Sequence, residues 1–200
     1  IAVDYSDLII LNSTISNNSA YRHGGILVGS ASNLYCEKTV ISDNSVDRNG
    51  SAIGVISSNS VELINITIAN NTGENDVGGF GDWGAAIYTE VNGVSVKNCI
   101  FYNNDPSNWH VENNATITVE YTNTGSPNPL FVDADNGDFT LQSASPCIDA
   151  GDPDLDGDGI DYTVDMDDQD PDGTRLDMGA YYFYQVDPPS DLIADAGDER

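Results

Sequence analysis

Basic residues are scarce in this sequence: six lysines and arginines stand against 33 aspartates and glutamates, giving a formal net charge of −27. A surface of this charge repels nucleic acids and anionic membranes, so we expect neither as a partner. It favours metal cations, or a saline medium that screens the self-repulsion. The sequence also lacks any apolar run near the ~20 residues that a transmembrane helix needs, so no membrane span is expected.

Cysteine is rare as well. The three cysteines, Cys36, Cys99 and Cys147, are odd in number and lack metal-ligand spacing. Each lies among apolar residues, in LYC, NCIF and SPCI, which favours buried free thiols over disulfide bridges. The sequence opens with neither an initiating methionine nor a signal peptide, so we expect Ile1 to lie inside a longer chain.

No segment has a helical hydrophobic period, which excludes a helical array and a leucine-rich horseshoe. The sequence does contain an internal repeat, with offsets of 26, 27 and 33 residues between copies. The copies are NSTISNN (12–18), KTVISDN (38–44), NITIANN (65–71) and NCIFYNN (98–104). A Gly-rich insertion, TGENDVGGFGDW (72–83), accounts for the longest offset.

At these offsets the apolar residues fall into columns, and within each run they alternate with polar residues at a period of two, as in short strands with one buried face. The columns are Ile15, Ile41, Ile68 and Phe101; Ile10, Cys36, Leu63 and Val96; Leu8, Leu34, Val61 and Val94; and Ile26, Ile53 and Ile87. A parallel β-solenoid stacks such repeats. We therefore predict an all-β fold, a right-handed parallel β-helix with coils of about 26 residues over residues 1–126.

Asparagine recurs at the end of one strand in each coil, at Asn18, Asn44, Asn71 and Asn104. Asparagine tolerates the left-handed backbone conformation of tight corners. Its side-chain amide can also hydrogen-bond to the same residue one coil away. We expect these four residues to form corners and to be linked along the solenoid.

Residues 127–184 depart from the repeat. NPLFVDADNGDFTLQSASPCIDAGDPD (128–154) and DPDGTRLDMGAYYF (170–183) closely resemble the C-terminal ending of secreted bacterial right-handed β-helix repeat proteins. The resemblance implies a secreted or cell-surface protein in which residues 127–184 form an irregular C-terminal cap that covers the open end of the solenoid. It implies no activity, because that family is defined by its shape.

The last stretch, DPPSDLIADAGDER (187–200), is similar to the opening of a fibronectin type III module. So short a segment cannot fold alone. We expect residues 185–200 to be either the start of a truncated next module or an acidic linker. In both cases other domains of the parent chain are expected partners.

Acidic residues concentrate in the cap, where residues 149–177 hold 12 of the 33. Within this region DLDGDGIDYTVD (154–165) has the spacing of a calcium loop, with Gly159 at its sharp turn, although no helix is expected on either side. A second half-motif follows the loop. The expected ligands are the side chains of Asp154, Asp156, Asp158 and Asp165, the main-chain carbonyl of Ile160, and the half-motif residues Asp168, Asp170 and Asp172.

Three features depart from the tight-binding form of this loop. Asp161 replaces the usual apolar residue at position 8, Tyr162 occupies position 9, and Asp165 rather than a glutamate closes the loop. These departures argue against sensor-grade affinity. We interpret the loop as a structural calcium site that stabilises a helix-free cap, the alternative being a solvated acidic loop without a metal.

The coils offer a candidate binding surface near the insertion. Following the repeat places Arg48 over Tyr21 and under Asp82, and aligns Arg22 with Asn49 and Trp83. A ridge of aromatic and polar groups of this kind can pack on sugar rings. The candidate binding residues are Tyr21, Arg22, Arg48, Asp82, Trp83 and Trp109. Alternatively, the two tryptophans cover the corner insertion.

Two functions remain open. The first is a non-catalytic extracellular module, a spacer or adhesin-like surface that binds a polysaccharide or cell-surface glycan; the second is a polysaccharide lyase or glycoside hydrolase with a site on the lateral face of the coils. Catalysis would need a base beside paired carboxylates, for which Arg22, Arg48 and Asp82 are weak candidates. The acids of the coils are scattered, at Asp43, Asp47, Glu62, Glu90, Glu112 and Glu120. No catalytic residue is therefore assigned. Stacking of coil ends into a filament is a weaker third possibility.

Overall fold

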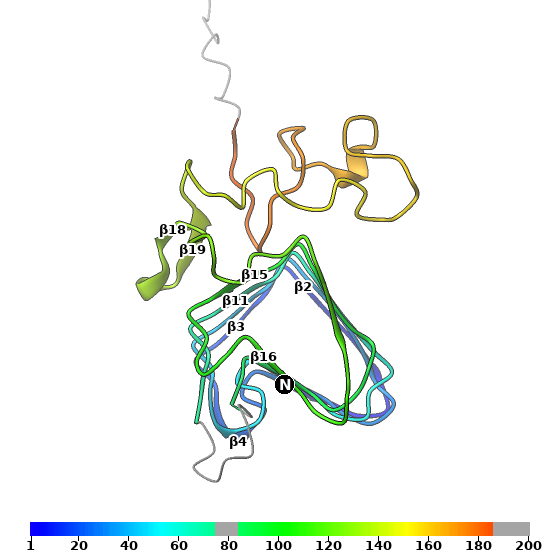
Figure 1. The fold of residues 1–200 in the computed structure, drawn as a ribbon, viewed down its shortest axis with the longest axis vertical. Coiled ribbons are helices and arrows are strands. Elements are labelled where there is room, and N and C mark those ends of the chain that lie inside the picture. The colour runs from blue at the N-terminus through cyan, green and yellow to red at the C-terminus, as the bar shows by residue number, and fades with distance from the viewer. Residues whose placement is uncertain (75–83, 186–200) are drawn as a thin grey trace, which may run out of the picture.

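The computed structural model describes residues 1–74 and 84–185. Its first part is a stack of coils, each made of short strands joined by tight corners. In Figure 1 successive coils superimpose and outline a triangle, with the cap standing beside one corner. The predicted right-handed parallel β-helix is confirmed.

Among the described residues, four parallel sheets run along the stack, each built from strands that lie one coil apart. Sheet A contains β1 (Ala2–Val3), β5 (Ile26–Val28), β9 (Ile53–Val55), β13 (Ile87–Thr89) and β16 (Trp109–Val111). Sheet B contains β2 (Asp7–Leu11), β6 (Asn33–Glu37), β10 (Ser60–Ile64), β14 (Val94–Lys97) and β17 (Ile117–Glu120). Sheet C contains β3 (Thr14–Ser16), β7 (Val40–Ser42), β11 (Thr67–Ala69) and β15 (Ile100–Tyr102). Sheet D contains β4 (Ser19–Arg22), β8 (Ser45–Arg48) and β12 (Thr72–Gly73).

The strand register confirms the predicted columns. In sheet C, Ile15 pairs with Ile41, Ile41 with Ile68 and Ile68 with Phe101. The column of Ile26, Ile53 and Ile87 in sheet A is equally confirmed and extends to Trp109. These side chains point inward and form one continuous core along the coils. Successive side chains of a strand point to opposite faces of the sheet. Because the strands are stacked in register, the same positions are buried in every coil.

The prediction of buried free thiols is also confirmed. Cys36, Cys99 and Cys147 are all free and buried. Burial raises the pKa of Cys36 to about 11 and that of Cys99 to about 12. Both residues belong to the coil core, where they act as small apolar side chains.

A ladder of asparagine side chains links the coils at the corner between sheets C and D. The Nδ2 of Asn18 donates to Oδ1 of Asn44 at 2.9 Å, Asn44 to Asn71 at 3.0 Å, and Asn71 to Asn104 at 3.0 Å. The predicted link is therefore confirmed. The left-handed backbone falls one residue earlier than expected, for example at Asn70 with φ of 55°. The ladder residue itself turns its amide inward to satisfy the backbone groups that this corner leaves unpaired.

Replacing Asn71 with alanine should lower the free energy of unfolding by about 2 kcal/mol or more, because the buried donors of Asn44 lose their acceptor. Asn18→Ala is the matched control, since Asn18 is exposed at the first rung. Chemical denaturation of both variants measures the difference. Equal losses from both substitutions would contradict a stabilising role for the buried part of the ladder.

The cap contains little regular structure, as predicted. A hairpin joins β18 (Phe131–Asp133) to β19 (Asp138–Leu141) through the short 3₁₀ helix η1 (Ala134–Asn136), and a second 3₁₀ helix, η2 (Met166–Asp168), follows the acidic loop. The expectation that the cap covers the open end of the solenoid is wrong. Phe131 and Phe139 instead pack with Ile100 on the outer side of sheet C, and Figure 1 shows the cap beside the coils. Apolar residues on that outer side are the reason, because the cap removes them from water.

Two further expectations concern the C-terminal stretch and a membrane span. The stretch similar to a fibronectin type III module (187–200) lies outside the described residues. Within residues 1–74 and 84–185, no helix is long and apolar enough to cross a membrane.

Candidate functional site

The acidic loop folds into consecutive tight turns. Gly157 and Gly159 adopt left-handed conformations, with φ of 77° and 88°, so the predicted turn at Gly159 is confirmed. The amide of Asp158 donates to Oδ1 of Asp156 at 3.0 Å, and the amide of Ile160 donates to Oδ1 of Asp158 at 2.7 Å. These turns bring successive aspartates back toward one another within a few residues of chain.

The carboxylates of the loop converge in two groups of three. One group consists of Asp154, Asp156 and Asp168, and the other of Asp156, Asp158 and Asp165; within each, one oxygen from every residue lies within 4.8 Å of the others. Asp156 belongs to both groups. Hard oxygen donors at this spacing are the ligands that Ca²⁺ prefers.

Asp168 is the buried member of these groups, with no exposed surface. Its Oδ1 accepts a hydrogen bond from the amide of Leu155 at 2.7 Å. Its Oδ2 and the Oδ1 of Asp154 are buried without a hydrogen-bond partner among the described residues. Burial, followed by the carboxylates of Asp156 and Asp165, raises the pKa of Asp168 above its ordinary value. Such oxygens destabilise the fold unless a proton or a cation neutralises them.

Asp170 and Asp172, the remaining residues of the half-motif, lie in neither group. Oδ2 of the buried Asp170 accepts from the amide of Asp177 at 2.8 Å. The carboxylate of Asp177 accepts from the amides of Asp149 and Phe183 at 2.7 and 2.6 Å. Burial raises the pKa of Asp170 to about 7 and that of Asp177 to about 6. In this structure the two buried carboxylates join separate segments of the cap.

Polar side chains at the corner between sheets B and C hold the cap on the coils. Nδ2 of Asn65 donates to the main-chain oxygen of Asp177 at 2.8 Å, and Oδ1 of Asn98 accepts from the amide of Asp152 at 2.7 Å. Lys97 forms an ion pair with the same Asp152 at 3.0 Å. Asn65 and Asn98 occupy equivalent corners, with φ of 52° and 55°. This role was not predicted from the sequence, although the recurrence of asparagine before β11 and β15 of sheet C could have indicated it.

Gly179 of the DMGA motif lies against the same corner. Its amide donates to the carbonyl of Asn98 at 2.8 Å, and the amide of Ala180 donates to Oγ1 of Thr67 at 3.0 Å. Gly179 has φ of 94°, and a Cβ atom there would lie 2.7 Å from Cδ1 of Ile100 and 3.0 Å from Oγ1 of Thr67. Only glycine allows the chain to approach the coils this closely.

We expect Gly179→Ala to destabilise the cap by more than the ~1–2 kcal/mol that a left-handed backbone alone costs an alanine. The matched control is Gly137→Ala, because Gly137 also has a positive φ, 82°, but a Cβ atom added there would have no neighbour within 4 Å. Thermal and chemical denaturation compare the two. An equal loss would show that crowding against the coils contributes nothing.

Tyr21, Arg22 and Arg48 come together on sheet D. The Cζ atoms of Arg48 and Arg22 lie 5.8 and 5.9 Å from the centroid of the Tyr21 ring, and Tyr21 is 59% exposed. The predicted alignment of Arg22 with Asn49 is wrong, because Arg22 pairs with Arg48. The extra residue of this coil enters after Arg48, so the offset is 26 in sheet D and 27 at Ile53 of sheet A.

Of the remaining candidates for this binding surface, the structure describes only Trp109, which is not on sheet D. Trp109 lies on sheet A, where its half-buried ring meets Phe101 edge to face at 5.4 Å between centroids. It packs against the coil core. Asp82 and Trp83 lie outside the described residues.

A cluster that was not predicted from the sequence lies on the side of sheet A that faces away from the core. Tyr88 and His110 pair in adjacent strands, and their rings stack with centroids 5.9 Å apart. The hydroxyl of Tyr88 donates to Oε1 of Glu90 at 2.9 Å, and Nε2 of His110 lies 3.0 Å from Oε1 of Glu112. The repeated spacing in YTE (88–90) and HVE (110–112) could have revealed the cluster.

Stacked parallel strands, a continuous inward core and polar ladders define the class of this protein as a parallel β-solenoid. A family model described as a right handed beta helix region matches residues 1–130, and the chain belongs to this family. No curated protein and no solved structure matches the chain.

Proposed function

We propose that this chain is a non-catalytic extracellular β-helix module, a rigid spacer or adhesin-like surface that binds glycans and whose cap is stabilised by calcium. One observation carries the calcium part: buried, unpartnered oxygens of Asp154 and Asp168 converge with the carboxylate of Asp156. A rigid stack of parallel sheets suits a role as spacer or surface.

The position of Asp168 explains how a cation would stabilise the cap. Asp154 opens the acidic loop, whereas Asp168 lies on η2, beyond the end of the loop. A cation shared by these residues and Asp156 would tie the start of the loop to η2 and relieve their mutual repulsion. Without a cation, two carboxylates about 4 Å apart near a protein surface repel by about 4 kcal/mol. The departures from the tight-binding pattern fit the weak affinities of extracellular calcium modules.

Calcium should raise the melting temperature of this protein, and a chelator should lower it. Asp168→Asn should abolish most of the calcium-dependent shift, because it removes the charge of the buried ligand. Asp135→Asn is the control: it removes one charge from an exposed position of the same cap, outside both groups. Scanning calorimetry with calcium and with chelator measures the shift. A wild-type melting temperature independent of calcium would refute the proposal.

The glycan part of the proposal rests on Tyr21 with its two arginines. An exposed aromatic ring flanked by guanidinium groups presents an apolar face together with hydrogen-bond donors. Two adjacent cations on a chain of net charge −27 favour an anionic glycan at this position.

The cluster on sheet A favours a second candidate function, a carbohydrate-active enzyme. Glu90 and Glu112 follow equivalent positions of adjacent strands, and each bonds to a titratable ring on the same face. Burial raises the pKa of Tyr88, with Glu90 adding to the effect, so the phenol stays protonated and keeps its hydrogen bond to Glu90. Paired carboxyl groups are what glycoside bond cleavage requires.

Incubation with a panel of acidic and neutral polysaccharides separates the two candidates. We expect retention of an acidic polysaccharide without new sugar ends, and retention should fall in Tyr21→Ala. New reducing or unsaturated ends that disappear in Glu112→Gln would overturn the non-catalytic assignment. Lys97→Ala serves as the control, because it removes a cation that lies on sheet B, belongs to neither cluster and is already paired with Asp152.

A further inference from the structure

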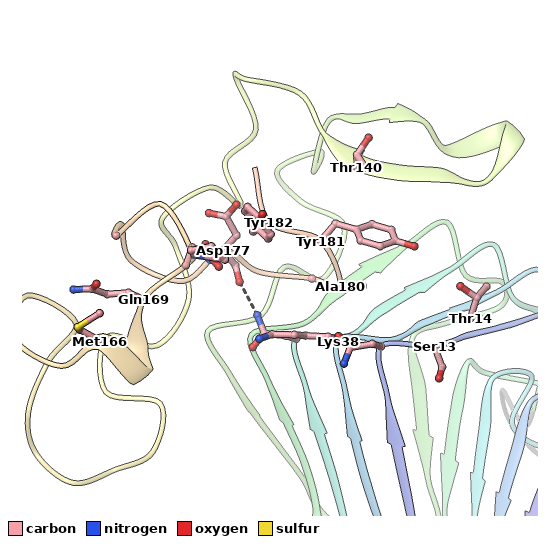
Figure 2. Close-up of a pocket in the computed structure, with 16 residues that line it drawn as sticks. Ser13, Thr14, Lys38, Thr140, Met166, Gln169, Asp177, Ala180, Tyr181 and Tyr182 are labelled. Carbon is pink, nitrogen blue, oxygen red and sulfur yellow. Dashed lines mark hydrogen bonds between the residues drawn. The ribbon is translucent and has the colours of Figure 1, made fainter. Parts of the chain in front are cut away.

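A cavity of about 710 Å³ separates the cap from the first coils. On the coil side it is lined by Ser13, Thr14 and Lys38, and on the cap side by Gln169, Tyr181 and Tyr182. Figure 2 shows these side chains on opposite walls, with Thr140 of β19 above Tyr181. Small-molecule sites typically have volumes of about 300–1,000 Å³ and mix aromatic with polar lining groups.

The corner that docks the cap also creates this cavity. Asn12, Lys38, Asn65 and Asn98 occupy the same corner in successive coils and share a left-handed backbone, with φ of 47°, 47°, 52° and 55°. Asn65 and Asn98 bond to the cap. Asn12 and Lys38 line the cavity without a hydrogen bond to the described part of the cap, and Asn65 borders the same cavity at its other end. The cap therefore follows the later coils closely and separates from the first two.

The first residue of the strands in sheet C also contacts the cap in a later coil and borders the cavity in the first coil. Oγ1 of Thr67 accepts from the amide of Ala180, whereas the equivalent Thr14 is exposed and lines the cavity. A second cavity of about 390 Å³ shares Thr14 and Tyr181 with the first. The two cavities therefore adjoin at Thr14 and Tyr181, over the first two strands of sheet C, and together they are called the groove.

The lining decides the chemical class of the ligand. Tyr181 and Tyr182 are 41% and 47% exposed, so two aromatic rings face a wall of hydroxyl and amide groups. Rings of this kind offer apolar faces, and the hydroxyls and amides offer both donors and acceptors. Lys38 is already 3.6 Å from Glu37, and the buried carboxyls of Asp170 and Asp177 complete the lining. An anionic ligand would be repelled.

We propose that this groove, formed by the cap and the first two coils, binds a neutral oligosaccharide. The groove is separate from the Tyr21 surface on sheet D, for which an anionic glycan is proposed, so either site can fail without the other. The pyranose faces pack on Tyr181 and Tyr182, and the sugar hydroxyls bond to groups on the coil wall such as those of Asn12, Ser13 and Thr14.

The test is a titration of the full chain with neutral hexasaccharides of glucose, mannose, galactose and xylose, and with hexagalacturonate. We expect one neutral hexasaccharide to bind and Tyr181→Ala to weaken it by about tenfold, the loss of one strong contact. Tyr184→Ala is the matched control, because Tyr184 is 52% exposed on the same segment but does not line the groove. Calorimetry gives the affinities, and circular dichroism verifies the fold of each variant.

A second variant tests the groove from the coil side. Thr14→Trp should block binding by filling the space between Thr14 and Tyr181 without altering the cap. Four results would overturn the proposal: no neutral hexasaccharide binds, hexagalacturonate binds more tightly, Tyr184→Ala or Tyr21→Ala weakens binding as much as Tyr181→Ala, or Thr14→Trp binds like the wild type.

Discussion

Alignment of each residue with its equivalent one coil away is the constraint on which the rest of this structure depends. Backbone hydrogen bonds between parallel strands fix that alignment, and a slip of one residue would turn every buried side chain to the solvent. The asparagine ladder fixes the same alignment with side-chain hydrogen bonds at one corner, where each amide donates to the next asparagine at 2.9 to 3.0 Å. Buried amides of this kind favour one register over its neighbours, since any slip leaves them unpaired.

The alignment of the coils determines where the cap attaches. Asn65 and Asn98 present their amides at equivalent corners, and the cap meets both with main-chain groups. Gly179 permits this approach, and the phenylalanines of the hairpin cover the apolar outer side of sheet C. Regularity in the coils thus positions a segment that has little regular structure of its own. The same regularity explains why the groove begins where the equivalent corners no longer touch the cap.

The sequence predicted the features that repeat. Period-two alternation and constant offsets located the columns, because each coil imposes the same burial on the same position. The local turn at Gly159 was also predictable, since it depends on only a few neighbouring residues. The side on which the cap lies was not predictable, because its contacts join residues such as Asn65 and Asp177, 112 positions apart. The burial of Asp168 and the stacking of Tyr88 on His110 likewise depend on tertiary packing. The misplaced Arg22 pairing shows how one extra residue within a coil defeats a constant offset.

Because the cap is attached to the later coils, coils with similar sequences differ in their number of contacts. Contacts in a solenoid pass only between neighbouring coils, so local opening can begin at whichever coil has the fewest partners. The third and fourth coils are fastened twice, to their neighbours and to the cap through Asn65 and Asn98. At the corner of the first coil, Asn12 borders a cavity instead. Amide hydrogens at this corner should therefore exchange more slowly in the third and fourth coils than in the first two.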